Sequence, residues 1–404
     1  MRYISAISIL ILIICVSTCS CAVIFGVGET SVPQTSIPDS FLESYYGTSE
    51  PVSEHIPDEK VWTAVDCGIP IATKYTSNTD TARNVWDIIC YDGYLYVGSG
   101  DFDKNAGPCE LWRMNLDTGR WEISGEVMDE QINRFEVIGG QLVSPGTDPR
   151  ASWSSGTWYR LTEEDTWETI NNIPGGVHIF DMIEFDGKVF AALGSVAGNS
   201  AMVVSNDGGI TFESVGMIKD GQDMAGFMYE LNRVYDLFVI EDTLCALYYG
   251  GKESALIFTY NGSYFEYNTS WKFKLIYNGW WYHPIGDKVN FDGKLYIAAG
   301  SLYAVDGTPE NIKNVRIEGV NHIWDVLTYD GKLYALCATV IDDGYTVSVM
   351  SLEEGSSTFE LVLGFDYDIP ARSFAFDGEK FYFGMGTLTD TGENLGRILS
   401  VEVE

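Results

Sequence analysis

One phrase recurs seven times along the chain, at intervals of about 47 residues. Each copy has a run of alternating apolar residues, a dipeptide such as Asp-Gly, and a second run rich in β-branched and aromatic residues, as in WDIICYDGYLYVGSG. The first residues of the dipeptides are separated by 47, 47, 55, 51, 38 and 47 residues, and they are Asp92, Gly139, Asp186, Glu241, Asp292, Asp330 and Asp377. Self-similarity of this period indicates a chain built from repeated structural units.

Each copy predicts four antiparallel strands. Asp-Gly between two apolar runs is typical of a type I′ hairpin turn. A third run such as ELWRMN and a fourth run such as RWEIS follow, and no amphipathic helical pattern interrupts them. The sequence therefore predicts an all-β fold, a seven-bladed β-propeller of four-stranded antiparallel blades.

The two ends of the repeat region predict how the ring closes. The last copy supplies only three strands (RSFAFD, KFYFGMG and GRILSVEV), whereas the segment Val61–Val65 resembles the fourth strands of the other copies. An N-terminal outer strand that completes the last blade would cover exposed sheet edges. A pair of β-sandwiches is the alternative, and it predicts no match between the two ends.

The N-terminal 60 residues differ in composition from the repeats. Residues 1–28 contain Arg2 and a mainly apolar, uncharged stretch, which is typical of a secretory signal peptide. A lipoprotein signal around Cys19 or Cys21 and a retained membrane anchor remain alternatives. Residues 29–60 are rich in Ser, Thr, Pro and Glu and predict a flexible linker before the propeller domain, residues 61–404. We therefore expect an extracellular protein, either secreted or tethered to a membrane through its N-terminus.

Charge excludes one class of partner. The chain has 58 acidic and 24 basic residues, which gives a net charge of −34. Nucleic-acid binding needs basic surfaces, so we expect no nucleic-acid partner.

The cysteines show no zinc-binding pattern. Five cysteines follow the linker (Cys67, Cys90, Cys109, Cys245 and Cys337), and none of them has the CxxC spacing of zinc ligands.

One segment carries a resemblance to a known family. Ser205–Phe212 (SNDGGITF) resembles the Asp-box, S-x-D-x-G-x-T-W, of the sialidase-like β-propellers, with Phe212 in place of Trp, and Asn115–Trp121 is a weaker echo. The resemblance implies a propeller in which the box stabilises a turn away from the active site. Asp207 is accordingly expected to be structural. Because sialidases have six blades, the resemblance identifies no catalytic residue here.

Charged residues recur at one position of the repeat, five residues before each turn. These residues are Asp87, Arg134, Asp181, Asp236, Asp287, Asp325 and Arg372. Three residues further back lie Asn84, Gln131, His178, Arg233 and His322, so that HIFD and HIWD repeat a His–Asp pair. Inner strands of a propeller begin on the face that carries the inter-blade loops, and we expect these side chains to surround one opening on that loop face.

Two interpretations of this rim remain open. An Asp at the start of each inner strand could cap a loop by accepting backbone N–H bonds. Alternatively, the crowded carboxylates form a ligand-binding rim, in which a cation or a sugar with many hydroxyls relieves their repulsion.

A second candidate site follows the first hairpin. Asp101, Asp103 and Asn105 alternate as D-x-D-x-N, like the first half of a calcium loop. Ala106 replaces the glycine of such loops, and Trp112 replaces the terminal Glu. Ca²⁺ is the one cofactor that the sequence suggests, and the alternative is a loop tied by its own Asp and Asn turns.

The sequence favours a monomeric binding module for a glycan or an extracellular protein. Residues 277–282 (YNGWWY) offer aromatic rings that stack on sugars. A sialidase-like glycoside hydrolase or lyase, with two rim carboxylates as acid and base, is the alternative enzyme. A structural or assembly factor without a small ligand is the third possibility. GxSxG, HExxH and P-loop motifs are absent.

Overall fold

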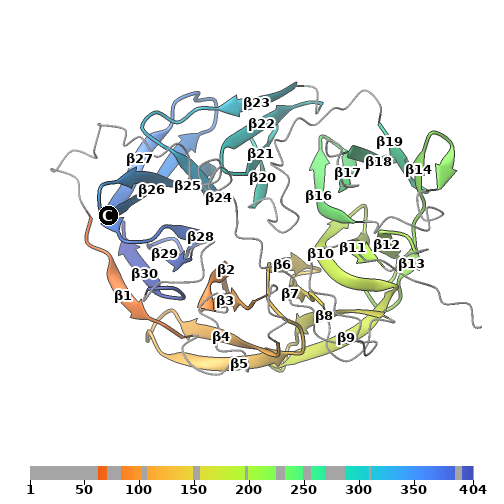
Figure 1. Cartoon of the computed structure of the whole chain (residues 1–404), viewed down its shortest axis with the longest axis horizontal. Helices are drawn as coiled ribbons and strands as arrows, with labels where there is room; N and C mark the ends of the chain where they lie inside the picture. The colour runs from red at the N-terminus through yellow and green to blue at the C-terminus, as the bar shows by residue number, and fades with distance from the viewer. Residues whose placement is uncertain are drawn as a thin grey trace, which may run out of the picture.

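The computed structural model describes residues 62–70, 83–101, 107–148, 155–195, 199–223, 233–248, 256–268, 287–308, 311–386 and 394–403. Within these ranges the chain forms strands and turns with essentially no helix. Seven sheets surround a central axis (Figure 1). The predicted all-β, seven-bladed propeller of four-stranded antiparallel blades is confirmed. The predicted signal segment and linker, residues 1–28 and 29–60, lie outside the described residues.

The first three blades run from the innermost to the outermost strand. Blade 1 contains β2 (Val85–Tyr91), β3 (Tyr94–Ser99), β4 (Cys109–Asn115) and β5 (Trp121–Val127). Blade 2 contains β6 (Glu136–Ile138), β7 (Gln141–Pro145), β8 (Ser155–Leu161) and β9 (Trp167–Pro174). Blade 3 contains β10 (Gly176–Phe185), β11 (Lys188–Ser195), β12 (Met202–Ser205) and β13 (Glu213–Ser214).

The next three blades repeat this order. Blade 4 contains β16 (Val234–Ile240), β17 (Thr243–Tyr248), β18 (Leu256–Tyr260) and β19 (Phe265–Tyr267). Blade 5 contains β20 (Lys288–Phe291), β21 (Lys294–Ala298), β22 (Leu302–Asp306) and β23 (Ile312–Val315). Blade 6 contains β24 (His322–Tyr329), β25 (Lys332–Ile341), β26 (Gly344–Glu353) and β27 (Glu360–Tyr367).

Blade 4 carries an addition that explains the longest interval of the repeat. A short hairpin of β14 (Met217–Lys219) and β15 (Gln222–Asp223) precedes its inner strand, and β14 pairs in parallel with the outer strand β19. The insertion lies between the turns at Asp186 and Glu241. It lengthens that repeat without changing the four-stranded core of the blade.

Blade 7 closes the ring as predicted. It contains β28 (Ala371–Phe376), β29 (Lys380–Met385), β30 (Ile398–Glu402) and the N-terminal β1 (Val65–Gly68), which pairs antiparallel with β30. The strand begins later than the predicted Val61–Val65, because Trp62 instead donates its backbone N–H to the carbonyl of Gly364 in blade 6 at 3.0 Å. The N-terminal segment thus contacts blade 6 through Trp62 and blade 7 through β1.

The predicted hairpin turns form at six anchors with left-handed backbone. Asp92, Gly139, Asp186, Glu241, Asp292 and Asp330 have φ between 45° and 58°. In the seventh copy the turn lies one residue later, since the N–H of Asp377 donates to the carbonyl of Lys380 at 3.2 Å and Gly378 has φ of 101°. Equivalent positions in blade 7 therefore shift by one residue relative to the sequence alignment.

Large apolar side chains fill the space between neighbouring blades. One buried cluster joins Phe190 of blade 3 to Phe258 and Phe265 of blade 4, and another joins Phe365 of blade 6 to Phe383 of blade 7. Burial of such aromatic rings supplies a large share of the stabilisation of stacked sheets. The core is therefore a ring of inter-blade layers.

The segment Ser205–Phe212 forms a turn held by its own side chains. Gly209 N–H donates to Ser205 Oγ at 2.8 Å, and Thr211 N–H donates to Asp207 Oδ1 at 2.8 Å. The Thr211 donors lower the pKa of Asp207 to about 2. Phe212 packs edge-on against Trp158 of blade 2, with ring centroids 6.4 Å apart. Asp207 stabilises this turn, as the sequence predicted.

The described residues include no helix that is long and apolar enough to cross a bilayer. The five cysteines are free thiols: Cys67, Cys90, Cys109, Cys245 and Cys337.

Candidate functional site

Three of the predicted rim carboxylates join neighbouring blades. Each accepts a backbone N–H from the next blade, within its inner strand or directly before it: Phe135 N–H to Asp87 Oδ2 at 2.6 Å, Leu237 N–H to Asp181 Oδ2 at 2.7 Å, and Phe374 N–H to Asp325 Oδ2 at 3.2 Å. A shift in strand register precedes each of these Asp residues, and such bulges re-aim the following side chain. These carboxylates accept backbone N–H groups, as in the capping interpretation, but the donors lie in the next blade rather than in a loop of the same blade.

Blade 7 has the same link with a different side chain. The register shift there lies between Ala371 and Ser373, so Ser373 occupies the position of Asp87 and Arg372 does not. Ser373 Oγ accepts the backbone N–H of Ile88 in blade 1 at 3.0 Å and lies 3.2 Å from Asp87 Oδ1. The ring is therefore joined by a polar contact at its point of closure.

We predict that Ser373→Ala destabilises the closed ring. The substitution leaves the buried N–H of Ile88 without its acceptor, which costs about 1–3 kcal/mol of unfolding free energy. Urea unfolding followed by tryptophan fluorescence measures the loss. Ser214→Ala, on an exposed outer strand, is the control and should change stability by less than about 0.5 kcal/mol. Equal stability of the two variants would contradict the link.

Two cations, Arg134 and Lys288, pair with both Asp181 and Asp236 near the axis. Arg134 Nη1 lies 3.0 Å from Asp181 Oδ1 and 3.3 Å from Asp236 Oδ1. Lys288 Nζ lies 2.7 Å from Asp181 Oδ2 and 3.3 Å from Asp236 Oδ1. The network joins blades 2, 3, 4 and 5, and Arg134, Asp181 and Asp236 are at most 3% exposed. Lys288 was not predicted, although it follows Asp287 directly in the sequence.

This environment changes the protonation of the axial acids. Burial alone would raise the pKa of Asp181, but Lys288 and Arg134 lower it below the ordinary value. Burial raises the pKa of Asp236. Burial, together with the charge of Asp287, raises the pKa of Asp87 to about 8. The nearby cations therefore outweigh the effect of burial on the pKa of Asp181 but not on that of Asp236.

Arg372 and His322 belong to a separate aromatic stack. The Arg372 guanidinium lies 4.1 Å from the ring centroid of Trp86 and 5.7 Å from that of Trp324, in the two flanking blades. The His322 ring lies 4.3 Å from Trp324. Burial, with the charge of Arg372, lowers the pKa of His322 to about 3. Both side chains are buried in packing between blades 6, 7 and 1.

The predicted calcium loop is described at one residue only. Asp101 is buried, and its backbone N–H donates to the carbonyl of Glu130 at 3.0 Å. Asp103 and Asn105 lie outside the described residues, as do the aromatic residues 277–282.

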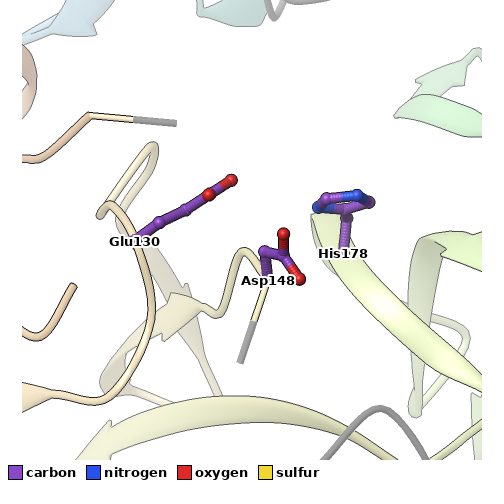
Figure 2. Close-up of side chains that lie close together, drawn as sticks. All are labelled: Glu130, Asp148 and His178. Carbon is purple, nitrogen blue, oxygen red and sulfur yellow. The ribbon is translucent and has the colours of Figure 1, made fainter. Parts of the chain in front are cut away.

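A cluster that the sequence analysis did not assemble lies at blades 1 to 3. Glu130 is in the connection from β5 to β6, Asp148 follows β7, and His178 lies near the start of β10. Figure 2 shows the three side chains reaching from separate segments into one region. One ligand atom of each lies within 4.8 Å of the other two, and all three residues are buried. Among the described residues, no other group of three or more such side chains is found.

Backbone pairing fixes the segments that carry this cluster. Glu130 N–H donates to the carbonyl of Thr147 at 3.2 Å, and Asp148 N–H donates to the carbonyl of Val177 at 3.2 Å. Thr147 and His178 also pair as an isolated antiparallel β-bridge. Asp148 itself has φ of 58°, a left-handed conformation that Asp tolerates better than most residues. The three side chains are therefore positioned by hydrogen-bonded backbone rather than by unpaired loops.

Four buried polar atoms on the segments that carry the cluster lack hydrogen-bond partners among the described residues. They are Asp129 Oδ1, Gln131 Oε1, Asp148 Oδ1 and His178 Nδ1. Their residues are at most 5% exposed. A buried polar atom without a partner costs about 1–3 kcal/mol, and it usually marks a ligand, an ion or a functional role.

Burial also changes the charge of these side chains. It raises the pKa of Asp129 to about 7 and that of Asp148 to about 6. Burial, with the charge of Arg233, lowers the pKa of His178 to about 3. The imidazole is therefore neutral at pH 7 and keeps a lone pair for a ligand.

Sequence reasoning reached part of this cluster. His178 and Gln131 were found by their register relative to the turns, whereas Glu130 and Asp148 lie in connections that have no fixed register. Asp148 follows β7 by three residues, and its approach to His178 depends on pairing between loops. The acidic pair Asp129 and Glu130 beside Gln131 was the available signal.

Comparisons with known proteins support no closer assignment. No family model and no curated protein matches the chain, so membership of the sialidase-like family is not confirmed. Among solved structures that resemble the propeller, an ulvan lyase from a new family of polysaccharide lyases is 14% identical in sequence. The match covers 85% of this chain and 96% of that chain, with a TM-score of 0.46. The WD40 domain of Neurospora crassa Pan2 is 11% identical over 87% and 98%, with a TM-score of 0.49. Similarities of this size assign neither substrate nor partner.

Proposed function

We propose that the protein is an exported, monomeric binding module that takes a glycan on its loop face at blades 1 to 3. The four buried polar atoms of Asp129, Gln131, Asp148 and His178 carry this proposal. They belong to two connections and one strand end that pair with one another through their backbones, and all four are atoms that accept hydrogen bonds. A sugar presents several hydroxyl donors at once, which would satisfy them.

The axial carboxylates favour binding over hydrolysis. A glycoside hydrolase needs two carboxyl groups that face the ligand as acid and base. Asp181 and Asp236 are instead buried in ion pairs with Arg134 and Lys288. The hydrolase or lyase therefore remains the alternative, as does an assembly factor without a small ligand.

Charge narrows the ligand class. A net charge of −34 repels polyanions, so we propose a neutral glycan and no nucleic-acid partner. Export, with or without a membrane tether, is proposed from the composition of residues 1–28. Under this proposal the propeller works at the cell surface or beyond it.

A panel of neutral glycans and chromogenic glycosides tests the proposal. We expect binding without turnover, and Gln131→Ala should weaken it about tenfold because one acceptor is lost. Gln141→Ala is the matched control, since Gln141 begins β7 beside the hairpin turn at the opposite end of the same blade's inner strands. Its affinity should equal that of the unmodified chain.

Three outcomes contradict the glycan proposal. Equal affinities for the two glutamine variants would place the ligand elsewhere. Turnover of a chromogenic glycoside would favour the enzyme. Capture of a protein with no response to any sugar would favour the assembly factor.

A further inference from the structure

The cluster at blades 1 to 3 brings two carboxylates and one imidazole so close together that one ion could contact all three. Binding of a sugar alone would not require this arrangement. We propose that Glu130, Asp148 and His178 bind a divalent transition-metal ion, and that Zn²⁺ fits the donor set best. This inference needs only the three side chains, so it stands whether or not a glycan binds.

Distances support a single ion among the three side chains. Oxygen and nitrogen ligands lie about 2.0–2.2 Å from Zn²⁺, so two ligands of one tetrahedral ion are about 3.3–3.6 Å apart. The ligand atoms of the cluster already lie within 4.8 Å of one another. Side-chain shifts of up to about 1 Å therefore suffice to bring them into coordination.

The donor types separate this site from the calcium site predicted near Asp101. Calcium takes six to eight oxygen ligands, whereas imidazole nitrogen prefers zinc and its neighbours among the transition metals. The cluster offers one imidazole and two carboxylates. Three protein ligands would leave an open coordination position, as in zinc sites that bind a substrate or water.

A cation would also reduce the repulsion among the buried carboxylates. The carboxylates of Glu130 and Asp148 lie in the site, and Asp129 is close enough to interact with the charge of Asp148. Burial raises the pKa of Asp148 and lowers that of His178, whereas the positive charge of Arg233 lowers the pKa values of both. A divalent ion would compensate part of the charge on these carboxylates. Asp148 Oδ1 and His178 Nδ1 are both without hydrogen-bond partners among the described residues, and both carry lone pairs suited to a metal.

Neighbouring atoms would orient what the metal binds. Gln131 Oε1 and Asp129 Oδ1 accept hydrogen bonds but have no donor in the described structure. A water or hydroxyl on the metal would supply donors to such atoms, in the way that outer-sphere groups tune zinc sites. The same open position would take a sugar hydroxyl if the proposed function is correct.

Metal binding by the full chain tests the proposal directly. The chain is stripped with a chelator, titrated with ZnCl₂ by calorimetry, and analysed for bound metal after desalting. The variants are Glu130→Gln, Asp148→Asn and His178→Gln, where Asn retains tolerance of the left-handed backbone at position 148. His322→Gln is the matched control, because HIWD repeats HIFD and His322 is equally buried but packs on Trp324.

We expect one Zn²⁺ that depends on the cluster. Each variant should weaken its binding by at least about 100-fold, whereas His322→Gln should stay within about twofold. Comparison with the control removes any background from thiols. Co²⁺ gives a second measurement, since its visible spectrum should change in His178→Gln. Circular dichroism checks that the variants fold, and Glu130→Gln carries the test if His178→Gln does not.

Several results would overturn the inference. They are no Zn²⁺ binding at millimolar concentration, equal losses in His178→Gln and His322→Gln, or unchanged binding in all three cluster variants. Titration without sugar keeps the test separate from the glycan proposal. Zinc binding without any glycan affinity would leave the metal site standing alone, and glycan binding without metal would refute only the metal site.

Discussion

Arg134→Met should lower the free energy of unfolding by about 3–5 kcal/mol, the largest single effect that we expect in the propeller. Removal of one partner from a buried ion pair leaves an uncompensated buried charge, which has a cost of this size. Arg134 contacts both Asp181 and Asp236, and Lys288 alone would then face the two carboxylates. Urea or thermal unfolding, followed by tryptophan fluorescence, measures the loss.

A control and a double variant distinguish the ion pair from simple loss of an arginine. Arg160→Met removes a surface arginine that lies 2.7 Å from Glu168, with both side chains partly exposed, and should cost at most about 1 kcal/mol. Adding Asp236→Asn to Arg134→Met removes an orphaned charge and should recover part of the stability. Strict additivity of the two substitutions, or a loss below 1 kcal/mol for Arg134→Met, would show that the network is not what holds blades 2 to 5 together.

His322→Gln should remove an acid sensitivity from the protein. The pKa of His322 falls from 6.5 to about 3 on burial beside Arg372. Below pH 6.5 the unfolded chain binds a proton at His322, whereas the folded chain does so only near pH 3. The contribution of the neutral His322 to the free energy of unfolding is therefore complete above pH 6.5 and is lost as the pH falls toward 3. At pH 4, roughly 2.5 pH units below the ordinary pKa of histidine, this loss amounts to about 3 kcal/mol.

The measurement compares unmodified chain and variant at pH 7 and pH 4. Gln does not titrate, so the stability of the unmodified chain relative to the variant should fall by about 3 kcal/mol between these pH values. Buried acids such as Asp87, whose pKa is raised to about 8, act in the opposite direction, but they are present in both proteins and cancel in the difference. Parallel pH profiles would mean that His322 is protonated, or solvated, in the folded state.

The architecture was predictable because its signals are local. Each hairpin needs only two turn residues with left-handed backbone between two apolar runs. Asp92, Asp186 and Asp330 adopt that backbone as predicted. Local signals also set the limits of accuracy. Asp377-Gly378 has the same dipeptide, yet its turn lies one residue later, and this displaced Arg372 from the position that Ser373 occupies.

The chemistry of the rim was only partly predictable. The sequence placed Asp87, Asp181 and Asp325 at equivalent positions, but whether a carboxylate meets a ligand or a backbone N–H depends on the neighbouring blade. Lys288 neutralises Asp181 across 107 residues of chain, a contact that no spacing encodes. The bulge before each Asp, which aims the side chain at the next blade, is likewise a property of the paired strands.

By itself the sequence determined the number of blades, the strand order within each blade and the closure by an N-terminal strand, because hydrophobic period and turn residues act over a few positions. Tertiary structure alone decided which charges meet. Glu130, Asp148 and His178 come from two connections and one strand end that approach only when the blades pack side by side. Their burial and missing hydrogen-bond partners arise from that packing, since desolvation depends on what surrounds a side chain in space.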